Sequence, residues 1–293
     1  MKKPQYLTII ISVLVLCVLW AFAKTVPSGK PSSGDEGHQK PIVLADESVL
    51  TSSFSIDSAL ASIKKSLPAQ NNGYVNNIEH LIATATDKEE KLHKYHQLSK
   101  FFKDSARAFI PYVWYTAEGA RLENSEKNLN FAGHLFVNNL QNVEDGELRK
   151  WMALQAKDLL ERSLKINPDN DSAKVALGAT YMFGGISNAP MQGIAKIREV
   201  VAKDSTNIYA QMTLAMGSLM SGQTEKAQER LETVTRLDPK NIQAILLLAD
   251  LFEKNGSSEE AIRLYQKAVP LITDHSEMKE ELEKRIVALK KQN

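Results

Sequence analysis

Four side chains on one predicted helix have a spacing that could hold a metal ion. His93 and His96 are three residues apart and lie close to Glu89 and Glu90, so a helix would place them near one another. Imidazole nitrogens and carboxylate oxygens are ligands that Zn²⁺ accepts. The same segment is rich in Lys, which is typical of a solvent-exposed helix face. We interpret it as such a face and predict no metal site and no cofactor.

Other residue types that could do chemistry are also sparse. Gly184-Gly185 follows a predicted helix and lacks the Lys-Ser/Thr ending of a phosphate-binding loop, so it fits a turn between paired helices. The single cysteine, Cys17, excludes an intrachain disulfide or a Cys-based metal site. A formal net charge of +1 argues against a nucleic-acid partner. We therefore predict no catalytic residues and no enzyme activity.

The elements that position the remaining side chains repeat along the chain. A leucine followed by a small residue recurs along the chain, with spacings of 37 and then 34 residues between Leu177, Leu214 and Leu248. A repeat of this length predicts a solenoid of stacked helical units. Small residues let two helices approach closely, while Pro and Asn end one helix and cap the next. The three registers are Leu177-Gly178, Leu214-Ala215 and Leu248-Ala249; Ala156, Gly193, Ala227 and Ala261; and the turns at 167–170, 204–207 and 238–241.

With these residues the chain resembles the tetratricopeptide repeat family. The resemblance covers about 171–274 and implies an all-α fold of about five helical hairpins that serves protein–protein interaction. The sequence departs from the family pattern at Gly193, where Ala is usual, and at Ser205, where Pro is usual. The matching positions are Gly178 with Tyr181, Ala227 with Leu231, Ala261 with Tyr265, and the turn prolines Pro168 and Pro239.

The N-terminal residues 1–23 are predicted to be a signal anchor that forms a single transmembrane helix. Tyr6 to Ala23 carries no charge, and at about 1.5 Å per residue it spans about 27 Å. The alternative is a secretory signal peptide cleaved after Ala23. In both interpretations Lys2 and Lys3 hold the N-terminus in the cytoplasm, and the body is extracytoplasmic, which in a bacterium means periplasmic.

Between this segment and the repeats we expect a linker and a divergent helical region. Residues 24–54 are rich in Pro, Gly and Ser, a composition that predicts a flexible linker. For residues 55–170 we predict divergent helical repeats. Within them, the sequence predicts a helix that Pro68 ends, a break at 71–73, a capping box from Thr86 to Glu89, and helices over 106–123 and 145–166. Residues 275–293 predict a capping helix with one apolar stripe formed by Met278, Leu282, Ile286 and Leu289.

The face formed by the first helix of each repeat is the candidate partner-binding groove. In proteins that this chain resembles, inward positions on these helices line the groove, and those that bind acidic chaperone tails carry Lys, Asn and Arg there. Here the positions are mostly apolar and rich in Met, which favours an apolar or amphipathic partner helix. The alternative is that these methionines pack in the core, as we expect for Met220. The candidate groove residues are Val175, Ala179, Met182, Tyr209, Met212, Met216, Leu246 and Asp250.

We therefore predict a membrane-tethered interaction scaffold that serves envelope protein assembly and whose protein partner is unidentified. Resemblance to membrane-anchored repeat proteins of bacterial envelopes suggests an accessory factor for cytochrome c assembly or for the export channel. A self-associating structural component of the envelope is the second hypothesis.

Overall fold

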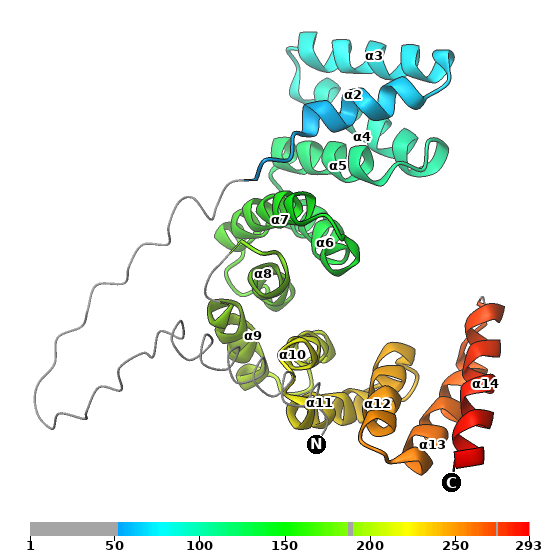
Figure 1. Ribbon diagram of the computed structural model, residues 1–293. Helices are drawn as coiled ribbons and strands as arrows, with labels where there is room; N and C mark the ends of the chain where they lie inside the picture. The colour runs from blue at the N-terminus through cyan, green and yellow to red at the C-terminus, as the bar shows by residue number, and fades with distance from the viewer. Residues whose placement is uncertain (1–51, 187–189, 274, 293) are drawn as a thin grey trace, which may run out of the picture. The chain divides into compact units, whose positions relative to one another are not determined.

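The computed structural model describes residues 52–186, 190–273 and 275–292, and the regular structure within them is entirely helical. Ten of its α-helices form five consecutive hairpins, in agreement with the sequence-based expectation (Figure 1). The hairpins pair α4 (Lys88–Lys100) with α5 (Phe109–Glu123), α6 (Glu126–Val137) with α7 (Gly146–Ile166), α8 (Asp171–Phe183) with α9 (Met191–Lys203), α10 (Ile208–Met220) with α11 (Thr224–Leu237), and α12 (Ile242–Lys254) with α13 (Ser258–Ala268).

Asparagine side chains start the first helix of three successive hairpins. The Oδ1 atoms of Asn170, Asn207 and Asn241 accept hydrogen bonds from the backbone N–H three residues on, at 2.8, 2.9 and 3.0 Å. Each bond satisfies one N–H group that a helix start leaves without a partner. The turn pattern that the sequence repeats therefore fixes where α8, α10 and α12 begin.

Glycines set the close approach of the two helices in the α8–α9 hairpin. A Cβ atom at Gly193 would lie 2.4 Å from the carbonyl oxygen of Gly178, and one at Gly178 would lie 2.5 Å from Cγ1 of Ile197. Both distances are shorter than a Cβ atom tolerates, so neither position accepts Ala without moving a helix. The departure from the family's Ala at position 193 thus has a packing cause.

Apolar side chains fill the space between consecutive hairpins. One buried cluster joins α5, α6, α7 and α8 around Leu129, Phe136 and Trp151. Another joins α10 to α14 (Ser276–Gln292) around Leu231 and Tyr265. Contacts between α6 and α8 and between α8 and α10 place the first helices of three hairpins along one face. That face is the one on which we expected a groove.

The predicted break at 71–73 is wrong, because α3 runs without interruption over Ala69–Thr84. Val75, Ile78 and Ile82 on α3 are all buried. Burial of each aliphatic side chain is worth about 1.5–3 kcal/mol, whereas a glycine inside a helix costs only about 1 kcal/mol. Packing therefore outweighs the local preference of Asn71-Asn72-Gly73 for a turn.

Helix boundaries around α4 and α5 also differ from the sequence-based ones. The N-cap of α4 is Asp87, not Thr86; its carboxylate accepts from the N–H of Glu90 at 2.7 Å. After α4 the chain forms a π-helical turn over Phe101–Ser105, and α5 begins at Phe109 instead of Ala106. Pro111 then lies in the first turn of α5, where no intrahelical partner for its nitrogen is needed. Residues 145–166 form the predicted helix, with Asp145 as the N-cap of α7.

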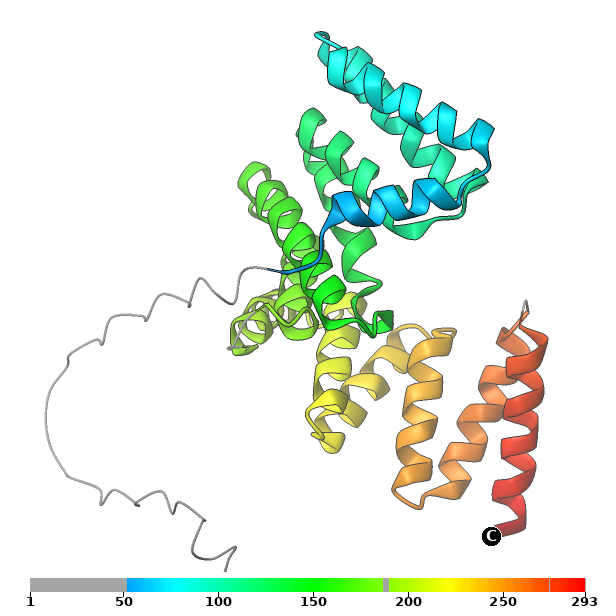
Figure 2. The ribbon, with the colours of Figure 1, turned by 45° about the horizontal axis from the view of Figure 1, so that its top comes forward.

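The C-terminal helix closes the stack as predicted. Leu282, Ile286 and Leu289 of α14 are buried against the preceding helices, whereas Met278 is 45% exposed. Figure 2 shows α12, α13 and α14 side by side at the orange-to-red end of the chain.

The described chain begins with residues that dock on the second hairpin. Ser53 donates its N–H to Oε2 of Glu147 at 2.7 Å, and the ring of Phe54 lies 5.0 Å from that of Trp151. These residues, the end of the predicted linker, thus lie against α7 before the chain enters α2 (Ile56–Ser66), which packs on α3 and α5. In the described part of the chain, no helix has the length and apolarity that crossing a bilayer requires. The predicted anchor at 1–23 lies outside the described residues.

Candidate functional site

A pocket of about 380 Å³ opens on the face that the first helices share. It brings together four of the eight predicted groove residues, Ala179 from α8 and Tyr209, Met212 and Met216 from α10. Sequence reasoning missed the part of its wall that comes from the end of α6 and the turn after it. The other lining residues are Val137, Asn138, Gln141, Asn142, Phe183, Thr213 and Gln243.

The remaining four predicted residues lie elsewhere. Val175 is completely buried in a cluster with Ile197, and Leu246 packs half-buried against the C-terminal cluster. Met182 leans toward Gly217 in the seam between two hairpins, away from this pocket. Asp250 accepts a hydrogen bond from Tyr265 and so belongs to the packing of α12 on α13.

The methionines divide between the two interpretations that the sequence left open. Met212 is 9% exposed and belongs to the C-terminal core, whereas Met216, one turn further along α10, is half-buried at the pocket. Met220, expected in the core, is 65% exposed. It is the last residue of α10, directly before the turn at Ser221-Gly222. The groove hypothesis therefore rests on Met216 more than on any other methionine.

The polar groups of this pocket carry no formal charge. Its rim has the amide side chains of Asn138, Gln141, Asn142 and Gln243, and its wall has the phenol of Tyr209. Burial raises the pKa of Tyr209 to about 12, so the phenol is protonated at neutral pH. Its hydroxyl has no hydrogen-bond partner among the described residues. An uncharged pocket that combines amide side chains with Met and Phe suits an apolar side chain with the backbone amides beside it.

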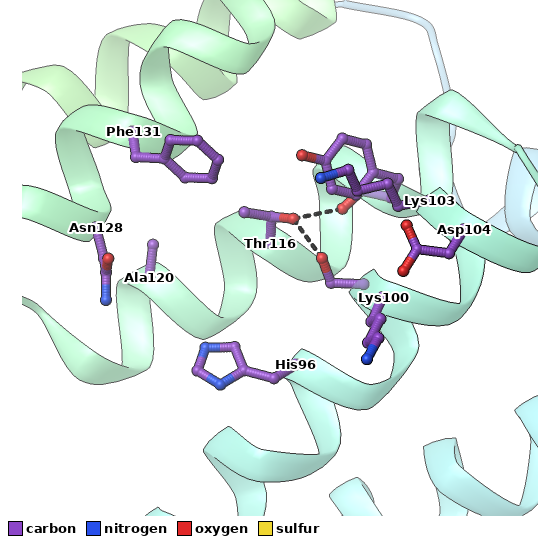
Figure 3. A pocket seen from close by; sticks show the side chains of 10 residues that line it. His96, Lys100, Lys103, Asp104, Thr116, Ala120, Asn128 and Phe131 are labelled. Atoms are coloured by element: carbon purple, nitrogen blue, oxygen red, sulfur yellow. Dashed lines mark hydrogen bonds between the residues drawn. The ribbon is translucent and has the colours of Figure 1, made fainter.

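A second pocket, of about 410 Å³, lies between α4, the π-helical turn, α5 and α6. Figure 3 shows Phe131 and Asn128 of α6 facing the side chains of α4 and the π-helical turn across it. Thr116 at the floor donates to the carbonyl of Tyr112 at 2.7 Å, so the 2.7 Å bond between its hydroxyl and Ser99 is donated by Ser99.

This second pocket is cationic and aromatic at its opening. Lys100 and Lys103 line it and form no ion pair within the described residues, although Asp104 lies on the same turn. The Lys103 ammonium lies 5.9 Å from the ring centroid of Tyr112. Phe131 is 52% exposed, which is unusual for an aromatic ring of this size. The two pockets therefore offer different chemistry.

The histidines that opened the sequence analysis are not gathered as ligands. His96 lines the cationic pocket, and the Nε2 atom of His93 lies 2.9 Å from the side-chain amide of Gln97. Among the residues that the structure describes, no group of three His, Cys, Asp or Glu side chains is placed to hold a metal ion.

Asp250 and Glu253 bind the C-terminal cap together. The hydroxyl of Tyr265 lies 2.5 Å from Oδ1 of Asp250 and 2.8 Å from Oε2 of Glu253, and Nε of Arg285 donates to Glu253 at 2.7 Å. Burial raises the pKa of Glu253, but the bonds from Arg285 and Tyr265 outweigh it, so the pKa lies below its usual range. This network joins α12, α13 and α14.

A Tyr265→Phe variant is expected to lose about 1 kcal/mol of unfolding free energy, because the two carboxylates lose the single phenolic proton that lies between them. A lowered carboxyl pKa contributes stability above the unfolded-state pKa that disappears as the pH falls through the folded-state pKa. The variant should therefore be less stable than the wild type at neutral pH, and the difference should shrink as the pH falls below the ordinary carboxyl pKa. Urea titrations at pH 7 and pH 3.5 measure this; an unchanged difference at both pH values would contradict the role given to the network.

Comparison with known proteins identifies part of this fold. Residues 218–283, from the end of α10 into α14, match the family model described as tetratricopeptide repeat. No curated protein matches the chain. The solved structure of TTC0263, a thermophilic TPR protein in Thermus thermophilus, is similar with 12% identity, over 69% of this chain and 98% of that chain, at a TM-score of 0.48.

Two other solved structures are similar over comparable lengths. MamA residues 41 to the end from Desulfovibrio magneticus RS-1 has 20% identity, over 63% of this chain and 95% of that chain, at a TM-score of 0.42. YrrB, whose structure is described as a TPR protein with an unusual peptide-binding site, has 18% identity, over 67% of this chain and 92% of that chain, at a TM-score of 0.39. At this level of similarity, these proteins say nothing about the partner of this chain.

Proposed function

We propose that this chain, a tetratricopeptide repeat protein by the match of residues 218–283, is a non-catalytic scaffold that binds a partner segment in the pocket between α6, α8, α10 and α12. Folds of this kind typically serve as protein-interaction modules. The observation that carries the proposal is the character of the pocket: a half-buried methionine and a neutral phenol surrounded by uncharged amides. Such a lining binds an apolar or amphipathic helix better than a charged tail.

The unpartnered hydroxyl of Tyr209 adds a directional contact. A buried phenol without a partner is destabilising by about 1–3 kcal/mol, and a backbone carbonyl of the partner would remove that cost. The cationic pocket beside Phe131 lies against the first helices α4 and α6. A partner that extends over both pockets would place acidic residues beside Lys100 and Lys103 and apolar ones beside Met216.

We also propose that residues 1–23 anchor this scaffold in a membrane with the body on the extracytoplasmic side. The proposal is supported by the uncharged run from Tyr6 to Ala23 after Lys2 and Lys3. An anchored scaffold of this kind would serve envelope protein assembly, including cytochrome c assembly or the export channel. Self-association as a structural component of the envelope is the competing function.

A photoreactive residue at Met216 is expected to form a discrete crosslink to a partner protein in membranes of the producing cell, whereas one at Lys284 on the exposed face of α14 is not. Carbonate-washed membranes should retain the crosslinked product if the anchor is uncleaved. A Met216→Lys change, made with the photoreactive residue moved to Gln243, should abolish the crosslink because it introduces a charge into an uncharged, half-buried pocket.

Three outcomes would overturn these proposals separately. Equal crosslinks at Met216 and Lys284 would contradict the pocket as the binding site. Crosslinks only between copies of the chain would favour the self-associating function. Recovery of the whole chain in the soluble fraction would contradict the uncleaved anchor.

A further inference from the structure

A third pocket, of about 160 Å³, lies in the seam between the third and fourth hairpins. Helices α9 and α11 both pack on α10, and the pocket lies among the three, away from the groove-side lining residues. Its apolar lining includes Met182, Ile194 and Leu214. The remainder of its lining is polar and includes Arg198 of α9 and Lys226 and Arg230 of α11.

Two of these three cations are held by neutral groups. Arg230 donates from Nη1 to the side-chain carbonyl of Gln211 at 2.7 Å, and Lys226 donates to that of Gln223 at 2.7 Å. None of the three forms an ion pair within the described residues. Burial lowers the pKa of Arg230; Glu229, its neighbour on α11, opposes this, while repulsion from Arg198 adds to it. An anion in the pocket would relieve that repulsion.

A buried amide fixes the direction of the Arg230 guanidinium. Gln211 is 6% exposed, one of few buried polar residues in the described chain, and its own Nε2 donates to the carbonyl of Ser205 at 2.9 Å. Both ends of the amide are therefore occupied, and the guanidinium is held in place before any ligand arrives. Guanidinium groups held in this way are well suited to bind the oxygens of an anion.

The repeat itself shows that the fold does not need these cations. The equivalent residues of the next repeat lie 34 positions further along the chain. There Glu232 and Glu260 replace the cations Arg198 and Lys226, and Glu225 replaces Met191. The positions that correspond to Gln211 and Arg230 are Ile245 and Leu264, which are both buried and apolar. Gln211 and Arg230 therefore form a polar contact at a place where the next repeat has an ordinary apolar core contact.

We propose that this seam is a binding site for a phosphate dianion, or for a phosphoryl group carried on a larger molecule. Three cations meet there, and the hydroxyl of Ser218 lines the same pocket. A dianion matches this excess of positive charge better than a single carboxylate does, and the volume accommodates one phosphate group. The apolar wall of Met182, Ile194 and Leu214 lowers the local dielectric constant and strengthens the attraction. The site is separate from the groove and does not depend on its function.

The test is a titration of the full-length protein with inorganic phosphate at pH 7.5, observed by NMR of ¹³C-labelled methionine methyl groups. Sodium chloride is exchanged for phosphate so that the ionic strength stays constant. The Met182 signal, assigned with Met182→Leu, is expected to shift and saturate at millimolar phosphate. Arg198→Gln, at an exposed position, should weaken the affinity about tenfold without affecting folding, and Arg230→Gln should do at least the same. Lys284→Gln on α14 should leave the affinity unchanged.

Three results would overturn the proposal. A shift that never saturates, or that chloride reproduces, would show general screening instead of a site. Acetate that binds as tightly as phosphate would contradict the assignment of a dianion. Unchanged affinity in Arg198→Gln, with a wild-type circular dichroism spectrum, would exclude the seam as the place of binding. The Met216→Lys variant should keep its phosphate affinity, so failure of this site and failure of the groove are distinguishable.

Discussion

Replacing Gly193 by Val is expected to lower the free energy of unfolding by about 2–3 kcal/mol. The new Cβ atom would lie 2.4 Å from the carbonyl oxygen of Gly178 and 3.0 Å from Cβ of Tyr181. Neither atom is the end of a flexible side chain, so α8 and α9 must move apart. Each hairpin of a solenoid is stabilised by its interfaces with the neighbouring hairpins. The loss should therefore also reduce the cooperativity of unfolding between the hairpins on either side.

Urea unfolding followed by far-ultraviolet circular dichroism measures this effect. Gly73→Ala is the matched control, since Gly73 lies inside α3 and a Cβ atom there meets nothing within 4 Å. That variant should be more stable than the wild type by about 0.5–1 kcal/mol, because Ala favours the helix over Gly. A Gly193→Val protein as stable as the wild type would mean that the two helices are not held at this crossing.

The second large effect is expected for Trp151→Ala, which should lose about 3–5 kcal/mol of unfolding free energy. Trp151 is 6% exposed, and its ring lies within 6.1 Å of the rings of Phe54, Trp114 and Phe136. Removing the indole leaves a cavity where α5, α6 and α7 meet. It also removes the surface on which Phe54 docks, so the residues before α2 should be released.

Phe54→Ala separates these two consequences. It removes the docking ring but leaves the core around Trp151 filled, so its effect on the unfolding free energy should be about 1 kcal/mol, well below that of Trp151→Ala. Hydrogen exchange should show faster exchange at the Ser53 amide in both variants, because its bond to Glu147 depends on the docked segment. Slow exchange at Ser53 in Phe54→Ala would show that the hydrogen bonds hold the segment without the ring.

Sequence periodicity was sufficient to predict the helical hairpins, because the residues that determine them act locally. The Asn caps at 170, 207 and 241 and the small residues at 178, 193, 227 and 261 act within one helix or between chain neighbours. The same local reasoning failed at Asn71-Asn72-Gly73, where three buried side chains further along α3 decide the outcome. It also missed the π-helical turn at Phe101–Ser105, which has no sequence signature of its own.

The candidate site could be predicted only in part, for a geometric reason. Helical spacing indicates which residues share a face, and Tyr209, Met212 and Met216, which it placed on one face, line one pocket. It does not indicate how far a neighbouring helix covers that face, and so Val175 was expected in a groove but is completely buried. The seam cations come from α9 and α11, and no signal within a single helix connects them. Comparing equivalent positions 34 residues apart could have found them, since Arg198 and Lys226 correspond to glutamates in the next repeat.

The docking of Ser53 and Phe54 on α7 has a mechanical consequence. Tension applied through the residues before Ser52 enters the body at the N-terminal end of α7, and not at α2. A few hydrogen bonds to Glu147 and one ring contact carry the load first, while α2 to α5 stay unstressed until those contacts break. When force is applied, the first event is therefore the detachment of residues 52–54 from α7, which lengthens the chain without unfolding a helix.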